Sequence, residues 1–198
     1  MAQSGGSMRP PSRKELAVRF CDAGLEDVEG LAQLHVQAWR DTYTGLLPQA
    51  MLDQLDLRQR MTQWHNAITH KAGRSGTGVV LARAGGDLLG FVSYGPQRDA
   101  DLALKGYDGE IEALYVQRNA QGRGLGRALL GHAGTRLQAA GFGAAALWVL
   151  EANAPACAFY AAMGAEICDT RIELRPEATL QDRAYGWRDL EALTAAGG

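Results

Sequence analysis

A short apolar run, a glycine-rich turn and a long helical pattern follow one another in the middle of the chain. The run GEIEALYV, residues 109–116, predicts a strand, and the segment that begins RALLGHAG at Arg127 predicts a helix. Between them, Gly122, Gly124 and Gly126 alternate within QGRGLG. Without side chains there, backbone amides can point outward at the positive end of the helix dipole. The segment therefore predicts a binding site for a phosphate group.

The composition favours a soluble domain. The chain has 198 residues, a formal net charge of −2 and 46% apolar residues, which suits one domain with a sizeable core. Acidic and basic residues are mixed throughout, which argues against a nucleic-acid partner. No apolar run approaches the roughly 20 residues of a membrane span, and no secretory leader pattern opens the chain. Cys21, Cys157 and Cys168 form neither a disulfide framework nor a zinc pattern, so we expect a cytoplasmic protein with no membrane partner.

The two ends of the chain are expected to lie outside the domain. The opening MAQSGGSMRPPS is small, polar and proline-bearing. We therefore expect residues 1–14 to be a disordered tail or an expression remnant. A single domain is expected over residues 15–192, followed by a short tail at 193–198.

Apolar periodicity and turn residues predict the other elements. Helices are expected at residues 27–43, 48–70 with a break near Asp56, 124–140 and 155–163. Strands are expected at residues 16–21, 78–84, 87–95, 110–116, 144–149, 166–174 and 183–188. Residues 96–109 are expected to form a loop, and residues 175–179 a turn. Without internal repeats, this order predicts one α+β domain with a mixed sheet.

Two common phosphate-binding motifs fit the glycine-rich turn poorly. A P-loop needs Lys and Ser or Thr after its last glycine, whereas Arg127 and Ala128 follow Gly126. A dinucleotide fingerprint needs glycine at position 127 or 129, and position 129 is Leu129. The dinucleotide interpretation would use Glu151 as a ribose ligand and remains an alternative.

A third motif, Q/R-x-x-G-x-G/A, is met by Gln121, Gly124 and Gly126 after a strand that ends at Tyr115 and Val116. A second segment, EANAPACAFYAAMGAE, fits N-x-x-A-x-x-F/Y-Y-x-x-x-G through the residues Asn153, Ala156, Phe159, Tyr160 and Gly164. With both motifs the chain resembles the GNAT (GCN5-related) N-acetyltransferases. The resemblance extends over nearly all of the chain beyond its first residues.

The resemblance implies a fold and a co-substrate. The expected GNAT fold is a mostly antiparallel mixed sheet of about six or seven strands, flanked by helices and splayed between two parallel middle strands. The co-substrate is acetyl-CoA, and no metal is implied. The residues expected to bind it are Leu114, Tyr115, Val116, Gln121, Gly122, Arg123, Gly124, Leu125, Gly126, Arg127, Asn153 and Tyr160. Ala165 departs from the family, which usually has an aromatic residue at that position.

The resemblance also assigns catalytic roles. The Val116 N–H is expected to face the thioester carbonyl, and Tyr160 is the expected acid for the departing thiolate. Glu110 and Glu112 are candidates for the general base, with a water chain as the alternative. Asn153 orients the cofactor or caps a helix, and both roles are compatible. Cys157 lacks a sequence neighbour that would activate it as a nucleophile, so an inert thiol is favoured.

The acceptor is expected to be a primary amine of a small molecule or peptide. Trp39 and Tyr43, one helical turn apart, are candidates for its binding site, and packing of this pair into the core is the alternative. The expected function is thus that of an acetyl-CoA-dependent N-acetyltransferase. A transferase of another acyl group and a non-catalytic CoA-binding sensor are alternatives. Homodimers are common in the family, although no interface can be identified from the sequence.

Overall fold

The structure, a computed structural model, describes residues 17–194 and is built on one seven-stranded sheet. The strand order is β1-β2-β3-β4-β5-β7-β6. The strands are β1 (Val18–Asp22), β2 (Gly78–Ala84), β3 (Asp87–Pro96), β4 (Gly109–Val116), β5 (Ala145–Leu150), β6 (Glu166–Arg175) and β7 (Ala178–Trp187). Neighbours are antiparallel except β4 and β5, which are parallel. The predicted fold class and the pair of parallel middle strands are confirmed.

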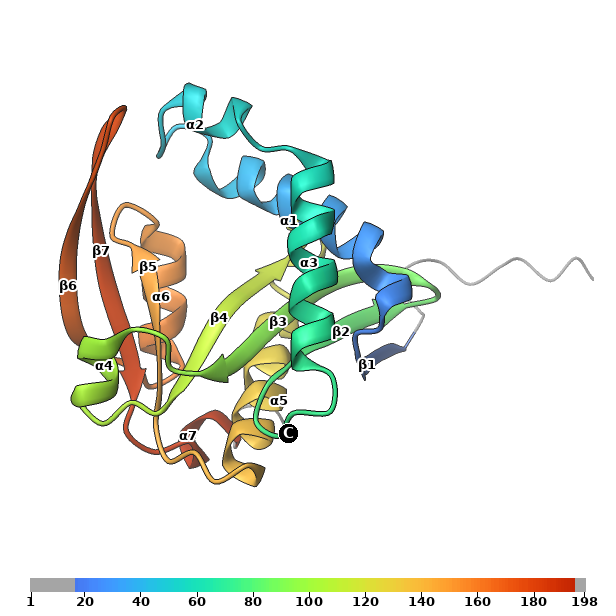
Figure 1. The fold of residues 1–198 in the computed structure, drawn as a ribbon, viewed down its shortest axis with the longest axis vertical. Coiled ribbons are helices and arrows are strands. Elements are labelled where there is room, and N and C mark those ends of the chain that lie inside the picture. The colour runs from blue at the N-terminus through green and yellow to red at the C-terminus, as the bar shows by residue number, and fades with distance from the viewer. Residues whose placement is uncertain (1–16, 195–198) are drawn as a thin grey trace, which may run out of the picture.

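Helices cover both faces of this sheet (Figure 1). They are α1 (Val28–Tyr43), α2 (Gln49–Asp53), α3 (Leu57–Lys71), α4 (Ala100–Leu104), α5 (Leu125–Ala139), α6 (Ala154–Ala162) and α7 (Glu191–Thr194). On one face, Leu31 of α1 and Trp64 of α3 pack against Phe91 of β3. On the other, Leu129 of α5 belongs to the main core together with Tyr160 of α6. Within residues 17–194, every helix is too short or too polar to cross a membrane.

The break predicted near Asp56 is confirmed. Its carboxylate accepts a hydrogen bond from the Gln59 N–H at 2.6 Å and caps the start of α3. Such a cap satisfies an amide that has no partner within the helix, so a new helix begins there. The capped start separates α3 from the short α2 and lets the two helices take different directions (Figure 1).

The predicted loop at residues 96–109 contains a helix that the sequence analysis missed. Asp99 accepts hydrogen bonds from the amides of Asp101 and Leu102, at 3.0 and 3.1 Å, and so caps α4. Leu102 is fully buried and packs with Tyr107 against β5 and β7. A cap and one buried leucine stabilise this single turn, which is too short to show helical periodicity.

The end of the domain also differs from the prediction. β7 begins at Ala178 rather than at residue 183, because only Pro176 and Glu177 separate it from β6. Leu193 in α7 is fully buried and lies beside Gly134 of α5. The folded chain therefore continues past residue 192, where the domain was predicted to end. The predicted tail at 1–14 and residues 195–198 lie outside the described residues.

Candidate active site

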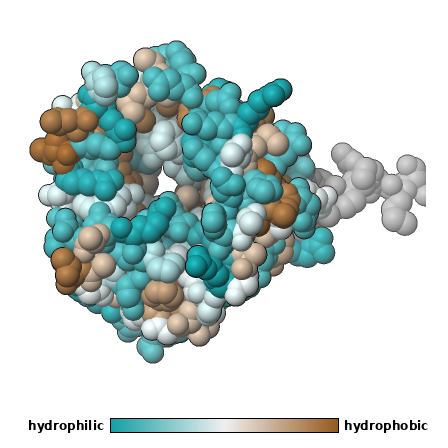
Figure 2. Space-filling model, viewed as in Figure 1, coloured by the Kyte–Doolittle hydropathy of each residue, from teal (hydrophilic) through white to brown (hydrophobic). Residues whose placement is uncertain are grey.

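The parallel strands β4 and β5 separate and leave a cleft in the middle of the sheet. They pair only at Gly109 with Ala145 and at Glu110 with Ala146. Just beyond, Glu112 is an extra residue in β4 opposite the middle of β3, and such a bulge bends a strand. The cleft beyond the bulge has a volume of about 880 Å³. Figure 2 shows it as a hollow near the centre of the molecule.

The β4 wall of the cleft has unpaired backbone amides. The Gln117 N–H donates to the Leu89 carbonyl of β3 at 2.8 Å. Successive residues of a strand direct their amides to opposite sides. The N–H groups of Val116 and Leu114 therefore face away from β3, toward the opening between β4 and β5. This is the arrangement that a hydrogen-bonded cofactor arm needs.

The glycine-rich loop lies at one end of this cleft. Gly122 and Gly124 have φ of 72° and 79°, in the left-handed region that favours glycine. Gly124 is the N-cap of α5, whose first backbone hydrogen bond joins the Ala128 N–H to the Gly124 carbonyl at 3.0 Å. Within the described chain, the amides of residues 122–127 donate to no backbone carbonyl. They form an uncapped helix start, which suits an anion.

The predicted cofactor residues converge on the cleft with one exception. The lining includes Leu114, Tyr115, Val116, Gln121, Gly122, Gly124, Leu125, Gly126, Arg127, Asn153 and Tyr160. Arg123 is the predicted residue that does not line it. Residues from β4, α5 and α6, far apart in the sequence, thus share one cavity.

Helix α6 forms the opposite wall. The Asn153 carbonyl oxygen accepts a hydrogen bond from the Ala156 N–H at 3.3 Å, which confirms the helix-capping role. Tyr160 is 8% exposed and borders the cleft. Burial and the neighbouring Tyr43 raise the pKa of the Tyr160 phenol. Among residues 17–194, no group forms a hydrogen bond with the Tyr160 hydroxyl, so it is free to donate to a ligand.

Two more tyrosines line the cleft near Tyr160. Tyr43 lies at the end of α1, and Tyr115 lies on β4. Burial raises the pKa of both phenols, that of Tyr115 well above its ordinary value. The Tyr43 phenol adds to the rise at Tyr115. All three side chains therefore stay neutral at physiological pH and offer hydroxyl donors.

Trp39 does not line the cleft. Its ring packs edge-on against Tyr43, with 5.0 Å between centroids, and lies 6.3 Å from the His35 ring. The Arg60 guanidinium lies over the Trp39 ring, 5.7 Å from its centroid. Trp39 thus packs against Tyr43 without lining the cleft, and its role in acceptor binding stays a prediction.

Glu110 is held away from the cleft. Arg98 binds its carboxylate through two nitrogens, Nε to Oε2 at 2.8 Å and a terminal nitrogen to Oε1 at 2.7 Å. The Arg98 backbone amide donates a third hydrogen bond at 3.1 Å. Glu110 is not among the residues that line the cleft. Its visible role is to fix the segment before α4 to the start of β4.

Glu112 borders the cleft, but its carboxylate also has partners. Lys71 Nζ lies 2.8 Å from Oε1, and the Ser93 hydroxyl donates to Oε2 at 2.5 Å. Lys71 also donates to the Thr77 hydroxyl and to the Tyr94 carbonyl. The network joins the end of α3 to the bulge in β4. The role of general base stays a prediction for Glu110 and for Glu112.

Trp148 is among the wall residues that the sequence analysis did not predict. The Trp148 indole borders the cleft, donates to Asp99 at 3.0 Å and lies 4.2 Å under the Arg171 guanidinium. These partners come from the N-cap of α4 and from β6, so no local sequence signal marks the contact. Cys157, by contrast, is buried with its thiol directed toward backbone carbonyls, and Glu151 pairs with Arg183.

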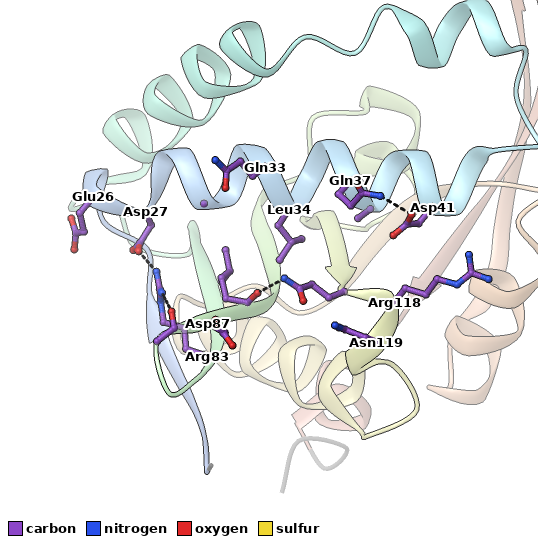
Figure 3. A pocket seen from close by; sticks show the side chains of 15 residues that line it. Glu26, Asp27, Gln33, Leu34, Gln37, Asp41, Arg83, Asp87, Arg118 and Asn119 are labelled. Atoms are coloured by element: carbon purple, nitrogen blue, oxygen red, sulfur yellow. Dashed lines mark hydrogen bonds and ion pairs between the residues drawn. The ribbon is translucent and has the colours of Figure 1, made fainter. Parts of the chain in front are cut away.

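A second hollow, of about 720 Å³, lies between α1 and the β2–β3 hairpin (Figure 3). Its lining includes Gln33, Gln37 and Asp41 of α1, and Asp41 lies at the end of the hollow nearer Arg118 (Figure 3). None of the predicted cofactor residues lines it.

Among residues 17–194, no group of three or more His, Cys, Asp or Glu side chains could hold a metal ion.

Comparison with known proteins gives a consistent result. The model of the acetyltransferase (GNAT) family matches residues 32–165. The chain is 35% identical over 174 residues to the uncharacterized N-acetyltransferase YuaI of Bacillus subtilis, covering 87% of this chain and 94% of YuaI. It is 29% identical over 148 residues to the L-methionine sulfoximine/L-methionine sulfone acetyltransferase of Pseudomonas paraeruginosa, covering 74% of this chain and 78% of that enzyme.

Two solved structures share the fold at lower identity. The PaiA N-acetyltransferase of Thermoplasma acidophilum, in complex with coenzyme A, superposes with a TM-score of 0.68 at 19% identity, covering 86% of this chain and all of PaiA. YncA of Salmonella typhimurium, with its cofactor acetyl-CoA, gives 0.66 at 18% identity, covering 88% and 94%.

Proposed function

Since the chain belongs to the GNAT family of acetyltransferases, we propose that it transfers the acetyl group of acetyl-CoA directly to a primary amine. The observation that carries this proposal is the shared cleft. Unpaired amides of β4, unpaired amides at the start of α5 and the Tyr160 hydroxyl all border it. Each supplies one contact that the transfer requires, and no metal is needed.

The residues present fit two parts of coenzyme A, the pyrophosphate and the pantetheine arm. The amides of residues 122–127, at the positive end of α5, suit the pyrophosphate. The Leu114 amide suits the amide-rich pantetheine arm, which can pair with a strand as another strand would, and the Val116 amide lies next along the same strand for the thioester carbonyl. Asn153 holds the start of α6 beside this path. When bound, acetyl-CoA would supply the thioester to be attacked.

Val116 and Tyr160 act in different steps of the proposed reaction. As the amine nitrogen attacks the carbonyl carbon, the Val116 N–H stabilises the negative charge on the carbonyl oxygen. The carbon–sulfur bond breaks, and the Tyr160 hydroxyl gives its proton to the leaving thiolate sulfur. Burial raises the pKa of Tyr160, so its hydroxyl stays protonated and can donate a hydrogen bond to the sulfur as the thiolate leaves.

The amine must also lose a proton, and we assign this step to water in the cleft. Glu110 is held by Arg98, and Glu112 is held by Lys71 and Ser93. These partners hold both carboxylates in fixed positions, and Glu110 does not line the cleft. Both glutamates then act as structural groups that hold β4 in its bent form.

The proposed acceptor site lies on the α1 side of the cleft, next to Tyr43. The Tyr43 hydroxyl can donate a hydrogen bond to the amine substrate or accept one from it. Trp39 packs against the Tyr43 ring and holds it in place. The Pseudomonas paraeruginosa relative is named for two amino acid derivatives, which supports a small primary amine over a protein.

The unpaired cysteines suit a reducing cytoplasm.

Thermal unfolding with acetyl-CoA, CoA, NAD and ATP in parallel tests the cofactor assignment. Binding at about 100 times Kd should add about 2.7 kcal/mol, or roughly 5–10 °C in Tm for a domain of this size. A rise with acetyl-CoA and CoA alone, followed by amine-dependent release of free thiol, supports the proposal. A rise with NAD would contradict the assignment of the loop. If CoA binds but no amine causes release of free thiol from acetyl-CoA, the sensor alternative is favoured.

A further inference from the structure

The indole of Trp148 is fixed in one orientation by side chains from two other segments. Its Nε1–H donates to Asp99 Oδ2 at 3.0 Å. The Arg171 guanidinium lies over the ring, 4.2 Å from its centroid. Arg171 is held there in turn by Asp182, whose Oδ2 accepts a hydrogen bond from Nε at 3.1 Å. A ring that is already immobile loses little rotamer entropy when a ligand packs against it, so it is suited to binding.

The indole surface that borders the cleft is not the surface under the guanidinium. Trp148 lines the cleft, whereas neither Arg171 nor Asp99 is among the lining residues. The ring is only partly buried by the protein. One face of the indole is therefore covered by Arg171, and the cleft meets the remaining surface. A fixed aromatic surface of this kind stacks on aromatic groups in offset or edge-to-face arrangements.

Trp148 lies at the closed end of the cleft, where β4 and β5 still pair. It comes two residues after Ala146, the last residue of β5 that pairs with β4. Leu147 and Val149 belong to the core on the α5 side of the sheet. Since successive residues of a strand point to opposite faces, Trp148 points to the face that α1 covers. The glycine-rich loop lies at the other end, so a cofactor arm that enters from the loop leaves the closed end to the acceptor.

The α1 side of the cleft is otherwise aromatic or apolar. Tyr43 at the end of α1 and Leu46 in the turn that follows both line it. Ala113 of β4 lines it as well, and packs with the apolar cluster under α1 and α3. An amine with a large apolar side group would therefore meet apolar surface around Trp148, and its burial would be favourable.

The acidic side chains of the lining, Asp41 and Glu112, already have partners. Glu112 pairs with Lys71 at 2.8 Å. Asp41 is exposed, accepts a hydrogen bond from Gln37 at 2.8 Å and also borders the second hollow. The two carboxylates behind the indole share one guanidinium. A second positive group on the acceptor would lose hydration at the closed end without gaining a free buried carboxylate.

We propose that Trp148 determines the class of acceptor, a primary amine with an uncharged aromatic side group that stacks on the indole. The inference rests on the proposed acetyl transfer and adds the acceptor to it. The bonds that form and break are those of the proposed reaction. Trp148 binds the side group only, and Arg171 is a positioning residue that acts through the indole.

Thiol release from acetyl-CoA with a panel of amines tests the proposal. The panel is phenethylamine, hexylamine, putrescine and ethanolamine, which offer an aromatic, an aliphatic, a cationic and a hydroxyl group. Aromatic stacking contributes about 0.5–1.5 kcal/mol beyond burial. The natural chain should therefore prefer phenethylamine to hexylamine by about two- to tenfold in kcat/KM, and to the two polar amines by more.

Substitutions then locate the preference in the indole. Trp148→Leu keeps an apolar side chain without a ring, and its preference for phenethylamine over hexylamine should fall to about onefold. Trp148→Phe restores a ring and should restore part of the preference. Arg171→Met frees the indole and should raise KM for phenethylamine with little effect on kcat. Leu104→Ala, at an 87% exposed position on α4, is the control and should keep the natural preference. Circular dichroism checks the folding of each variant.

Failure of this proposal can be told from failure of the acetyl transfer. If thiol is released but putrescine or ethanolamine is the better substrate, or if Trp148→Leu keeps the natural preference, the role of Trp148 is wrong and the transfer stands. If no amine releases thiol, the transfer is contradicted, and calorimetric titration of the CoA complex with phenethylamine decides. Binding that is about tenfold weaker in Trp148→Leu supports the stacking site. No binding, or equal binding by both proteins, overturns it.

Discussion

The side-chain amide of Gln121 donates a hydrogen bond to the backbone carbonyl of Val116, with 3.1 Å between nitrogen and oxygen. The bond joins the first residue of the glycine-rich loop to the last residue of β4. It fixes the distance between the two places where we propose that the pyrophosphate and the thioester carbonyl bind. A bond within the protein thus sets the spacing that the cofactor must match.

Replacing Gln121 with Ala should weaken cofactor binding. The loss of one exposed hydrogen bond costs about 1 kcal/mol, which corresponds to roughly a fivefold higher Kd for CoA. Titration calorimetry measures this change. Gln138→Ala, on the exposed side of α5, is the control and should leave the Kd unchanged. An equal effect of both variants would indicate a general loss of helix stability instead.

Replacing Gly124 with Asp should abolish cofactor binding. Its φ of 79° makes any side chain unfavourable by about 1–2 kcal/mol, and a carboxylate repels the phosphates. Gly141, with φ of 90° and open space around it, provides a matched control in Gly141→Asp. Both variants should lose about 2–8 °C in Tm. Only Gly124→Asp should lose the stabilisation by CoA, and retention of that stabilisation would contradict the assignment of the loop.

Replacing Tyr160 with Phe should lower kcat by about a hundredfold, because the thiolate then leaves without an acid. Affinity for acetyl-CoA should change little, so the effect lies on the chemical step. Since burial raises the pKa of Tyr160, its ionisation should not reduce the rate at mildly alkaline pH. Tyr185→Phe, whose ring lies 6.1 Å from that of Tyr160, is the control. Unchanged turnover in Tyr160→Phe would remove the phenol from the mechanism.

Replacing Glu112 with Gln should lower the stability of the protein and leave the pH dependence of catalysis unchanged. Lys71 would lose its anionic partner in a site where both side chains are less than 20% exposed (13% and 16%). We expect a loss of about 1–3 kcal/mol. Glu110→Gln breaks a pair whose Arg98 is 66% exposed and should cost less than about 1 kcal/mol.

Thermal unfolding and a pH–rate profile separate the structural role from a catalytic one. If the glutamates are structural, both variants keep the acidic limb of the natural profile. If that limb disappears in Glu112→Gln or in Glu110→Gln, the residue concerned is the general base, and the assignment to water is wrong.

The sequence predicted the residues of β4, α5 and α6 that line the cleft better than it predicted the α1 side, for a physical reason. The loop at residues 121–127 and the cap at Asn153 are local: each depends on glycine conformation or on a helix start, which few residues encode. Their spacing along the chain also fixes their place on adjacent elements. A short motif could therefore locate both.

The partners of the glutamates could not be predicted in this way. Lys71, Ser93 and Arg98 reach Glu112 and Glu110 from other elements, across 12 to 41 residues of sequence. Such contacts depend on the register of β3 with β4 and on the bulge, which no periodicity reveals. Trp39 could not be placed from the sequence either. Helical spacing predicts that it lies beside Tyr43, but it does not show whether the side chain lines the cleft or packs in the core.

His35 provides a test of the buried aromatic cluster next to the proposed acceptor site. Its ring lies 5.0 to 5.6 Å from those of Trp64, Phe91 and Tyr115, and its Nδ1 has no hydrogen-bond partner among the described residues. Burial, with a smaller effect of Arg60, lowers the pKa of His35 to about 3. In the unfolded chain the pKa returns to about 6.5.

Between these two pKa values the unfolded state binds a proton that the folded state does not, so stability rises with pH and is lost as the pH falls. From pH 7 to pH 5, His35 alone should remove about 2 kcal/mol from the free energy of unfolding. Urea unfolding of the natural chain and of His35→Leu at both pH values measures this contribution. The variant should lose about 2 kcal/mol less than the natural chain over this interval. His65→Gln, at an exposed position, should behave like the natural chain. An equal loss in all three proteins would show that His35 is protonated in the fold and that the cluster admits water.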